Sequence, residues 1–386
     1  MNNQAFTEKY YIDRKNTSSI KWARGKQMNC LPMWIADMDF KCNERIIEHL
    51  NDFIAYGDYG YANLPEDYYD TVIAWHRKRN DVVYKQEWFR TSKGAVDAMY
   101  QVIHALTKEN DPIMINTPLY PPFKDTILKT KRKVVESKLI DTDGYFTFDY
   151  ADIKKKFKEK KVKMLMLCSP HNPVGRVWKK GELEELFALC KKYKVLVCSD
   201  EVHSDIIMPD QTFYPALSFK EYQDLIISII AASKSFSLAV FSHSHIVIAN
   251  EKLRNRFISY QQLQHTGGIN AFNALPTYYA YKYGEEWMDA LNNVVFENYH
   301  YIREHLGKYL NMTSLEGSYL LFLDLGAYND QESASKCLIE NCHILTNPGE
   351  DFSKRYNNWV RVNLATSLDN IKKAVKAITK YIRSTK

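Results

Sequence analysis

The residues of this chain that could do chemistry follow short apolar runs, at the points where buried strands would end. Lys234 comes directly after such a run and stands between two serines. A lysine becomes a useful nucleophile when its pKa is lowered, and forming an imine with an aldehyde cofactor achieves this. The alternative is a strand-end lysine whose ammonium group reaches solvent. The position therefore predicts either a cofactor anchor or a surface lysine.

Two further side chains would complete a site for a pyridine ring. Asp200 follows the apolar run 195–198 and one serine. A carboxylate buried there can pair with a pyridinium nitrogen and keep it protonated. Asn172 lies in a turn with two prolines and a glycine, where its amide could donate to a phenolic oxygen of the cofactor. The alternatives are an aspartate that caps the next helix and ordinary turn chemistry.

A phosphate group has candidate ligands as well. Gly94, Ala95 and Val96 open an amphipathic segment, and a glycine before a helix leaves backbone N–H groups free for a phosphate. Ser233 and Ser235, on either side of the lysine, could add hydroxyl donors. We therefore expect the phosphate between these two segments.

A substrate amino acid would need a carboxylate ligand. Arg361 stands inside an otherwise apolar run, and its planar guanidinium suits bidentate capture of a carboxylate, although a structural ion pair would also use it. Tyr120 lies in a proline-rich turn where its ring could stack on the cofactor plane. With 27 tyrosines in the chain, a packing role for Tyr120 is the alternative.

The elements that must position these residues alternate through the middle of the chain. Expected strands cover residues 112–116, 162–168, 195–198, 225–231 and 246–249, and expected helices include 96–106, 123–131 and 182–193. This α/β alternation predicts a mainly parallel sheet with helices on both faces. In such sheets ligands bind beyond the carboxyl ends of the strands, where the candidate residues lie.

A chain of 386 residues exceeds what one core usually serves, so two domains are expected. Residues 1–45 predict an irregular N-terminal arm that joins the smaller domain. Residues 46–284 predict the large domain. Residues 285–386 predict a small α+β domain, with helices at 285–310 and 332–341, strands at 319–324 and 360–364, and a basic amphipathic helix at the end.

Composition argues against several function classes. The net charge is +6, and the lysine-rich run 154–161 has the pattern of a solvated helix face, so we expect no nucleic-acid partner. The longest apolar run, 225–232, is far below the roughly 20 residues that span a bilayer, so we expect no membrane contact. The seven cysteines lack metal-ligand spacing, which predicts no metal site. Free cysteines and no evident signal peptide favour a cytoplasmic protein.

Taken in chain order, the candidate residues resemble the fold-type I pyridoxal-phosphate family, the aspartate aminotransferase-like superfamily. The ordered set is Gly94, Tyr120, Asn172-Pro173-x-Gly175, Asp200-Glu201, Ser233-Lys234 and Arg361. The resemblance spans essentially the whole chain and implies pyridoxal 5'-phosphate as cofactor. It implies Lys234, Asp200 and Tyr120 as catalytic residues, and it adds His203 to the residues that contact the cofactor.

A narrower resemblance is to the MalY/PatB-type C–S lyases, the cystathionine β-lyases. Its marks are Lys21-Trp22, the phrase 31–40, Tyr59-Gly60-Tyr61, and the segments 118–123, 200–205 and 316–320. In such enzymes the tyrosine matching Tyr61 reaches the partner subunit's phosphate, which implies a homodimer with composite active sites. The resemblance also implies Ala36, Tyr61 and Arg361 as contacts of the amino-acid substrate.

The chain departs from this family around the predicted anchor. The family usually has Thr, Asn and Gly where this chain has Ser235, Ser237 and Val240, and it often has a proline where Lys93 precedes the phosphate turn. No arginine follows shortly after Lys234, which is similar to the lyase branch. These departures put the local loop geometry in question.

The activity that the resemblance implies is α,β-elimination from cystathionine or a related cysteine S-conjugate, giving a thiol, pyruvate and ammonia. An aminotransferase acting on an amino acid and a 2-oxo acid would use the same residues, because both reactions share every step up to the carbanion. A third possibility is a regulator that binds the cofactor and retains residual lyase activity. Retention of Lys234, Asp200 and Arg361 argues against loss of the site.

Overall fold

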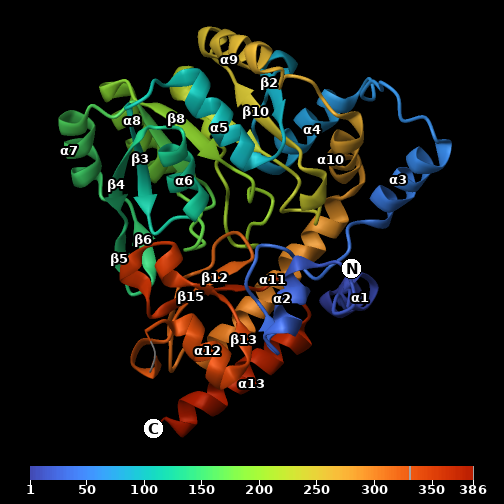
Figure 1. The fold of residues 1–386 in the computed structure, drawn as a ribbon, viewed down its shortest axis with the longest axis vertical. Coiled ribbons are helices and arrows are strands. Elements are labelled where there is room, and N and C mark those ends of the chain that lie inside the picture. Colours follow the sequence, from blue (N-terminus) through green and yellow to red (C-terminus); the bar gives the residue numbers. More distant parts are fainter. Residues whose placement is uncertain (330–331, 386) are drawn as a thin grey trace.

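The structure, a computed structural model, describes residues 1–329 and 332–385. Its larger part is built on a seven-stranded sheet in the order β2-β10-β9-β8-β7-β3-β4 (Figure 1). The strands are β2 (Phe89–Ser92), β3 (Pro112–Thr117), β4 (Lys133–Lys138), β7 (Met164–Cys168), β8 (Leu196–Asp200), β9 (Ile226–Ile230) and β10 (Ser244–Ile248). Neighbouring strands are parallel except at β10, which is antiparallel to both β2 and β9. The predicted mainly parallel sheet is thus confirmed.

Helices cover both faces of this sheet, because its central strands are apolar on both sides. One face packs on α5 (Ala95–Leu106), α6 (Pro121–Lys129) and α9 (Glu251–Gln264). The other face, which includes Leu165, Val197 and Val247, shares one core with the rest of the chain. Helices of that second core are α3 (Glu44–Tyr56), α4 (Tyr68–Asn80), α7 (Tyr150–Lys160), α8 (Lys180–Tyr193) and α10 (Ala271–Tyr283).

A second, smaller sheet lies below the large sheet in the view of Figure 1. Its antiparallel order is β11 (Asn311–Met312), β12 (Leu320–Asp324), β15 (Trp359–Asn363) and β14 (Asn347–Pro348). The helices beside it are α11 (Glu285–Leu306), α12 (Ala334–Cys342) and α13 (Leu368–Ser384). A hairpin of β5 (Ile140–Thr142) and β6 (Tyr145–Thr147) lies between the two sheets in Figure 1. The domain limits 1–45, 46–284 and 285–386 stay a prediction.

The N-terminal segment is more regular than its weak periodicity predicts. It contains α1 (Asn3–Tyr10) and α2 (Ile20–Gln27). Polar caps explain both helices, since the Asn2 side chain accepts from the Ala5 N–H and the Ser19 side chain accepts from the Trp22 N–H. The following strand, β1 (Leu31–Pro32), pairs in parallel with β13 (Ile344–Leu345). The segment is therefore attached to the smaller part of the molecule.

The lysine-rich run, the cysteines and the acidic side chains can each be located in the structure. The lysine-rich run 154–161 forms the end of α7, where Ile153 and Phe157 are buried and most of the lysines are exposed. Free thiols are found at Cys30, Cys42, Cys168, Cys190, Cys198 and Cys342. Within the described residues, no group of three or more His, Cys, Asp and Glu side chains could hold a metal ion. No helix in that part of the chain has the length and apolar character that a membrane crossing requires.

Candidate active site

Lys234 follows β9 and faces the N-terminal segment. Its Nζ donates to the Ala36 carbonyl oxygen at 2.9 Å. Burial lowers the pKa of its ammonium group, and the nearby positive charge of Arg361 lowers it further. A lysine with a lowered pKa supplies the neutral amine that both imine formation and proton removal need. The environment thus supports the predicted anchor over a solvent-exposed lysine.

Asp200 ends β8, next in the sheet to the strand that precedes Lys234. It is 6% exposed, and burial raises the pKa of its carboxyl group to about 6. The Val202 N–H, 3.3 Å from Oδ1, and the positive charge of Lys234 oppose this rise without cancelling it. A buried carboxylate that is short of positive charge fits the ring N–H of a pyridinium group. The donor set here is therefore suited to pyridoxal phosphate.

Arg361 joins the small sheet to the large one. It lies on β15, is buried, and donates from NH1 to Asn172 Oδ1 at 3.0 Å and from NH2 to Asn347 Oδ1 at 2.7 Å. Burial lowers its pKa to about 10, so the guanidinium stays charged at neutral pH. Its Nε is buried and has no hydrogen-bond partner among the described residues. A cation held by neutral amides keeps its charge uncompensated, which favours an anionic ligand.

The same contact orients Asn172 for the role predicted from its turn. Arg361 occupies the Oδ1 oxygen, so the Nδ2 amide is the group left to donate to a ligand. The Asn172 carbonyl also accepts from the Tyr120 N–H at 3.1 Å. This bond connects the Tyr120 turn to the turn that carries Asn172. Burial raises the pKa of the Tyr120 phenol. Tyr120, with its phenol protonated, is thereby held next to the site.

The predicted phosphate-binding residues Gly94, Ala95 and Val96 lie at the start of α5. Gly94 is the N-cap, with a φ of 99° that L side chains rarely adopt, and a Cβ placed there would meet no atom within 4 Å. Ala95 and Val96 form the first turn, whose N–H groups lack intrahelical acceptors. Because β10 is antiparallel to both β2 and β9, those two strands end at the same edge. Gly94 and Lys234 follow those ends.

The two serines beside Lys234 differ in what they can offer a phosphate. Ser235 is fully buried and its Oγ donates to Asp205 Oδ2 at 2.7 Å. Its hydroxyl proton is therefore committed, and the expectation that Ser235 donates to the phosphate is wrong in this structure. Ser233 is only partly buried. It remains the candidate donor next to the lysine.

His203 lies three residues after Asp200 and is also buried. Burial, together with the charges of Lys234 and Arg361, lowers its pKa to about 3, so the imidazole is neutral. Its Nδ1 has no hydrogen-bond partner among the described residues. Its ring packs edge-on to Tyr319 with centroids 5.9 Å apart. A neutral imidazole with an open nitrogen is consistent with the predicted contact to the cofactor.

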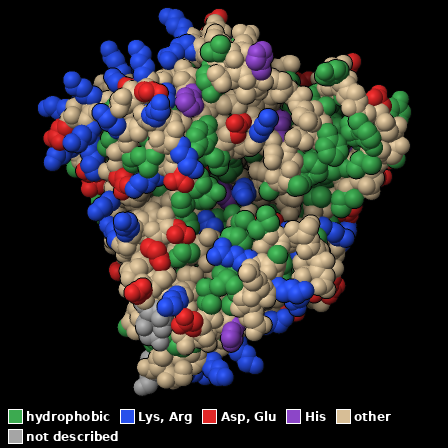
Figure 2. Space-filling view, viewed as in Figure 1, with side chains coloured by type: hydrophobic (Ala, Val, Ile, Leu, Met, Phe, Trp, Pro, Cys, Tyr) green, Lys and Arg blue, Asp and Glu red, His purple; other side chains and the backbone are tan. Residues whose placement is uncertain are grey.

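The structure does not bring Tyr61 to the other site residues of its own chain. Tyr61 follows α3 on an exposed loop, and its side chain is fully accessible. Other exposed apolar residues lie on α3 and this loop, and Figure 2 shows hydrophobic side chains gathered on that side of the molecule. They are Ile47, Ile54, Tyr56 and Tyr59. A contribution of Tyr61 to a site thus requires a second subunit.

The departures from the family motif leave a regular loop after Lys234. Ser237 adopts a left-handed φ of 60°, a conformation that asparagine tolerates better than serine. Val240 is 83% exposed in a short 3-10 turn. The serine at 237 therefore carries some backbone strain, whereas the valine at 240 meets no steric conflict.

Sequence reasoning missed several residues that the structure places at the site. Asn347 holds Arg361, and Trp34 accepts from the same guanidinium through its carbonyl at 3.4 Å. Phe352 packs its ring 4.9 Å from the guanidinium carbon. Asn347 opens β14, but its sequence Asn-Pro-Gly signals a turn and nothing more. Residues that act through backbone carbonyls leave no signal in side-chain type.

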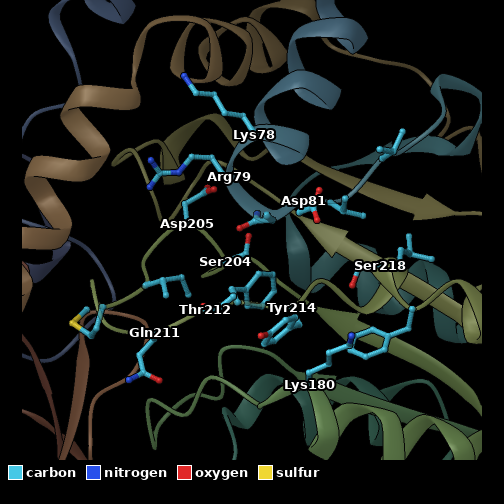
Figure 3. Close-up of a pocket in the computed structure, with 18 of the residues that line it drawn as sticks. Lys78, Arg79, Asp81, Lys180, Ser204, Asp205, Gln211, Thr212, Tyr214 and Ser218 are labelled. Atoms are coloured by element: carbon cyan, nitrogen blue, oxygen red, sulfur yellow. The ribbon is translucent and has the colours of Figure 1, made fainter.

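A separate cavity of about 1450 Å³ lies between α4 and the loop that follows β8 (Figure 3). Lys78 and Arg79 of α4 lie on one side of it, and Asp205 points toward it from the loop after β8. Asp205 accepts hydrogen bonds from Trp75 Nε1 at 2.8 Å and from Ser235 Oγ. Lys234, Asp200 and Arg361 do not line this cavity. Asp205 connects the wall of this cavity to the Lys234 loop through its hydrogen bond from Ser235.

Comparison with known proteins decides the family. Residues 36–378 match the aminotransferase class I and II family. The chain belongs to this family. It is 30% identical to cystathionine beta-lyase PatB of Bacillus subtilis, over 95% of this chain and 97% of PatB. This similarity confirms the narrower resemblance to the PatB-type enzymes.

Solved structures of family members have the same fold. Cystalysin from Treponema denticola, whose crystal structure contains pyridoxal 5'-phosphate, superposes with a TM-score of 0.92 at 30% identity, over 97% of this chain and 98% of cystalysin. The PLP-bound C–S lyase from Staphylococcus hominis superposes with a TM-score of 0.90 at 30% identity, over 97% and 98% of the two chains. The predicted fold type I architecture is confirmed.

Proposed function

We propose that this chain is a pyridoxal-phosphate-dependent C–S β-lyase. Its reaction would be α,β-elimination from cystathionine or a related cysteine S-conjugate, giving a thiol, pyruvate and ammonia. The observation that carries the proposal is the placement of Lys234, with its lowered pKa, between the buried Asp200 and the charge of Arg361. The similarity to PatB and to two PLP-bound lyase-type structures supports it.

The residues divide the work of the reaction between them. Arg361 binds the substrate α-carboxylate through its uncompensated charge. The neutral Lys234 amine takes the α-proton onto Nζ, since its pKa is lowered. When bound, pyridoxal phosphate supplies an electron sink that stabilises the resulting negative charge, and Asp200 keeps that sink protonated. The C–S bond then breaks, its electron pair leaves with sulfur, and water completes the release of pyruvate and ammonia.

Pyruvate formation tests this function against its alternative, an aminotransferase. The purified protein, loaded with pyridoxal phosphate, is incubated with cystathionine with and without 2-oxoglutarate. We expect pyruvate in both samples, and we expect Lys234→Ala to abolish both turnover and the visible absorption band of the bound cofactor. Product that forms only when 2-oxoglutarate is present would instead establish an aminotransferase.

We also propose a cytoplasmic homodimer with composite active sites. The full exposure of Tyr61 and the apolar side chains around it support a subunit interface at α3, and the free thiols of six cysteines, Cys337 apart, support a reducing compartment. Subunit mixing tests the composite site, because a hybrid of Lys234→Ala and Tyr61→Ala chains has one intact site out of two. Mixing the inactive Lys234→Ala variant with the impaired Tyr61→Ala variant should give about a quarter of wild-type activity, as random pairing of a C2 dimer predicts. No recovery would refute the shared site.

A further inference from the structure

Asn363 lies two residues after Arg361 on β15, so both side chains project from the same face of the strand. It is fully buried. Its Nδ2 donates to two backbone carbonyls of the N-terminal segment, Ile35 O at 2.7 Å and Asp37 O at 2.8 Å. Its backbone N–H donates to a third, Met33 O, at 2.9 Å. One residue therefore fixes the segment at three points.

The two carbonyls that the Asn363 amide holds flank Ala36. The Asp37 N–H also donates to Ile35 O at 2.8 Å, which closes a three-residue turn with Ala36 at its centre. In such a turn the central carbonyl lies outside the hydrogen-bonded ring. The Ala36 carbonyl is the one that accepts from Lys234 Nζ. The clamp on its two neighbours thus determines where that carbonyl points.

We infer that Asn363 is a positioning residue for Lys234. By holding the carbonyls of Ile35 and Asp37, it aims the Ala36 carbonyl at the lysine amine and so fixes the direction from which Lys234 reaches the substrate α-carbon. This inference rests on the proposed function, in which Lys234 removes the α-proton. It concerns proton transfer more than substrate binding, because Arg361 keeps its bonds to Asn172 and Asn347 without Asn363.

The chain offers a matched control in Asn298 of α11. This residue is also fully buried, and its Nδ2 donates to two alternate carbonyls, Leu364 O and Thr366 O, each at 2.9 Å. The two asparagines make the same kind of clamp through Nδ2, Asn363 on residues 35–37 and Asn298 on residues 364–366. Asn363 Oδ1 also accepts from the Ala365 N–H at 2.8 Å. Replacing either one removes a similar pair of bonds, but the carbonyls that Asn298 holds have no hydrogen bond to Lys234 or Arg361 among the described residues.

Asn363→Ala should fold, since Lys21 Nζ also binds Asp37 O at 3.1 Å and the turn keeps its own hydrogen bond. In the cofactor-loaded enzyme we expect kcat to fall by about 10- to 100-fold, as misplacing a catalytic group does, with KM changed by less than about threefold. The deuterium isotope effect on kcat with α-deuterated substrate should rise. Asn298→Ala should leave kcat and the isotope effect near wild type while lowering the melting temperature by a similar amount.

Hydrogen exchange supplies a readout that does not depend on turnover. The backbone amides of residues 33–37 should exchange faster in Asn363→Ala than in wild type and should be unchanged in Asn298→Ala. The Asp39 amide is left out of the comparison because it donates to Ala365 O, between the two carbonyls that Asn298 holds. If Asn363→Ala is insoluble, Asn363→Ser, which keeps one donor, is measured in the same way and should show an intermediate loss of kcat. Equal kcat values for the Asn363 and Asn298 variants, or a loss confined to KM, would overturn the inference. Failure of the proposed function would differ, because wild type itself would then release no pyruvate.

Discussion

The buried carboxylate of Asp200 should make the cofactor-free protein less stable than a variant with a neutral side chain at this position. Its carboxyl group is buried, and its pKa rises from 3.8 to about 6. Each unit corresponds to about 1.4 kcal/mol, so the ionised carboxylate costs roughly 3 kcal/mol of folding free energy at neutral pH. Asp200→Asn removes that charge and keeps an oxygen for the Val202 N–H. We therefore expect this variant to unfold with a free energy up to about 3 kcal/mol higher than wild type.

The pH dependence follows from the sign of the shift. Because the folded pKa is raised, the folded state binds more protons than the unfolded state between about pH 4 and pH 6. The penalty is absent below this window, grows through it as pH rises, and is complete above it. The stability difference between Asp200→Asn and wild type should therefore increase from pH 4.5 to pH 7.5. Burial raises the pKa of the neighbouring Glu201 to about 7, and the Asp200 charge raises it further, so removing that charge eases the burial of Glu201 and adds a stabilisation of the same sign.

Urea unfolding of the cofactor-free proteins at these two pH values is the measurement. Asp205→Asn is the control, because Asp205 is also buried but accepts from both Trp75 and Ser235, so an amide N–H there would face a donor. That variant should lose stability at both pH values. Asp200→Asn should lose lyase turnover while gaining stability, since a neutral amide does not keep the ring nitrogen protonated. A destabilised Asp200→Asn protein at pH 7.5 would refute the reasoning.

Two other substitutions have clear expected outcomes. Arg361→Lys replaces a planar guanidinium by an ammonium group that cannot bind Asn172, Asn347 and a carboxylate at the same time. KM should therefore rise by roughly 10- to 100-fold in initial-rate assays with a cysteine S-conjugate. An unchanged KM would contradict the carboxylate role. Lys21→Met leaves the buried Asp39 carboxylate without its ion-pair partner and should lower the free energy of unfolding in urea by about 3–5 kcal/mol. The double variant Lys21→Met with Asp39→Asn should recover much of this loss. Equal losses in the single and double variants would show that packing, not charge, explains the effect.

The large sheet could be predicted because its strands are buried on both faces and have a continuous apolar pattern. Strand β9, with the sequence Ile-Ile-Ser-Ile-Ile, is the clearest case. The antiparallel direction of β10 could not be predicted, since periodicity carries no information on direction. The helices α1 and α2 were missed because their apolar faces are short and their caps, Asn2 and Ser19, resemble loop residues. The end of α11 was placed too late, because the apolar pattern continues past Leu306 into β11.

The site divides in a similar way. Lys234, Asp200 and Arg361 could be identified because their side chains carry the chemistry and stand at strand ends or in an apolar strand. Ser235 was predicted to donate to the phosphate, but its hydroxyl donates to Asp205 instead. This contact could not be predicted, because the position of Asp205 depends on tertiary packing. The Ala36 carbonyl gains its role from the turn that presents it, and its side chain gives no indication of this. Assignments of roles to the individual site residues stay predictions until variants are measured.

The contacts that complete the site join the N-terminal segment to residues far along the chain. Arg361 binds Trp34 across 327 positions of sequence, and Lys234 binds Ala36 across 198. During synthesis the N-terminal segment leaves the ribosome first and must wait for β15, one of the last strands made, before the substrate pocket can close. A ribosome-bound chain that already contains Lys234 and the loop after it would therefore still lack Arg361, its carboxylate-binding arginine. Competence to bind substrate arrives late and all at once, so premature termination before residue 361 should yield no partly active enzyme.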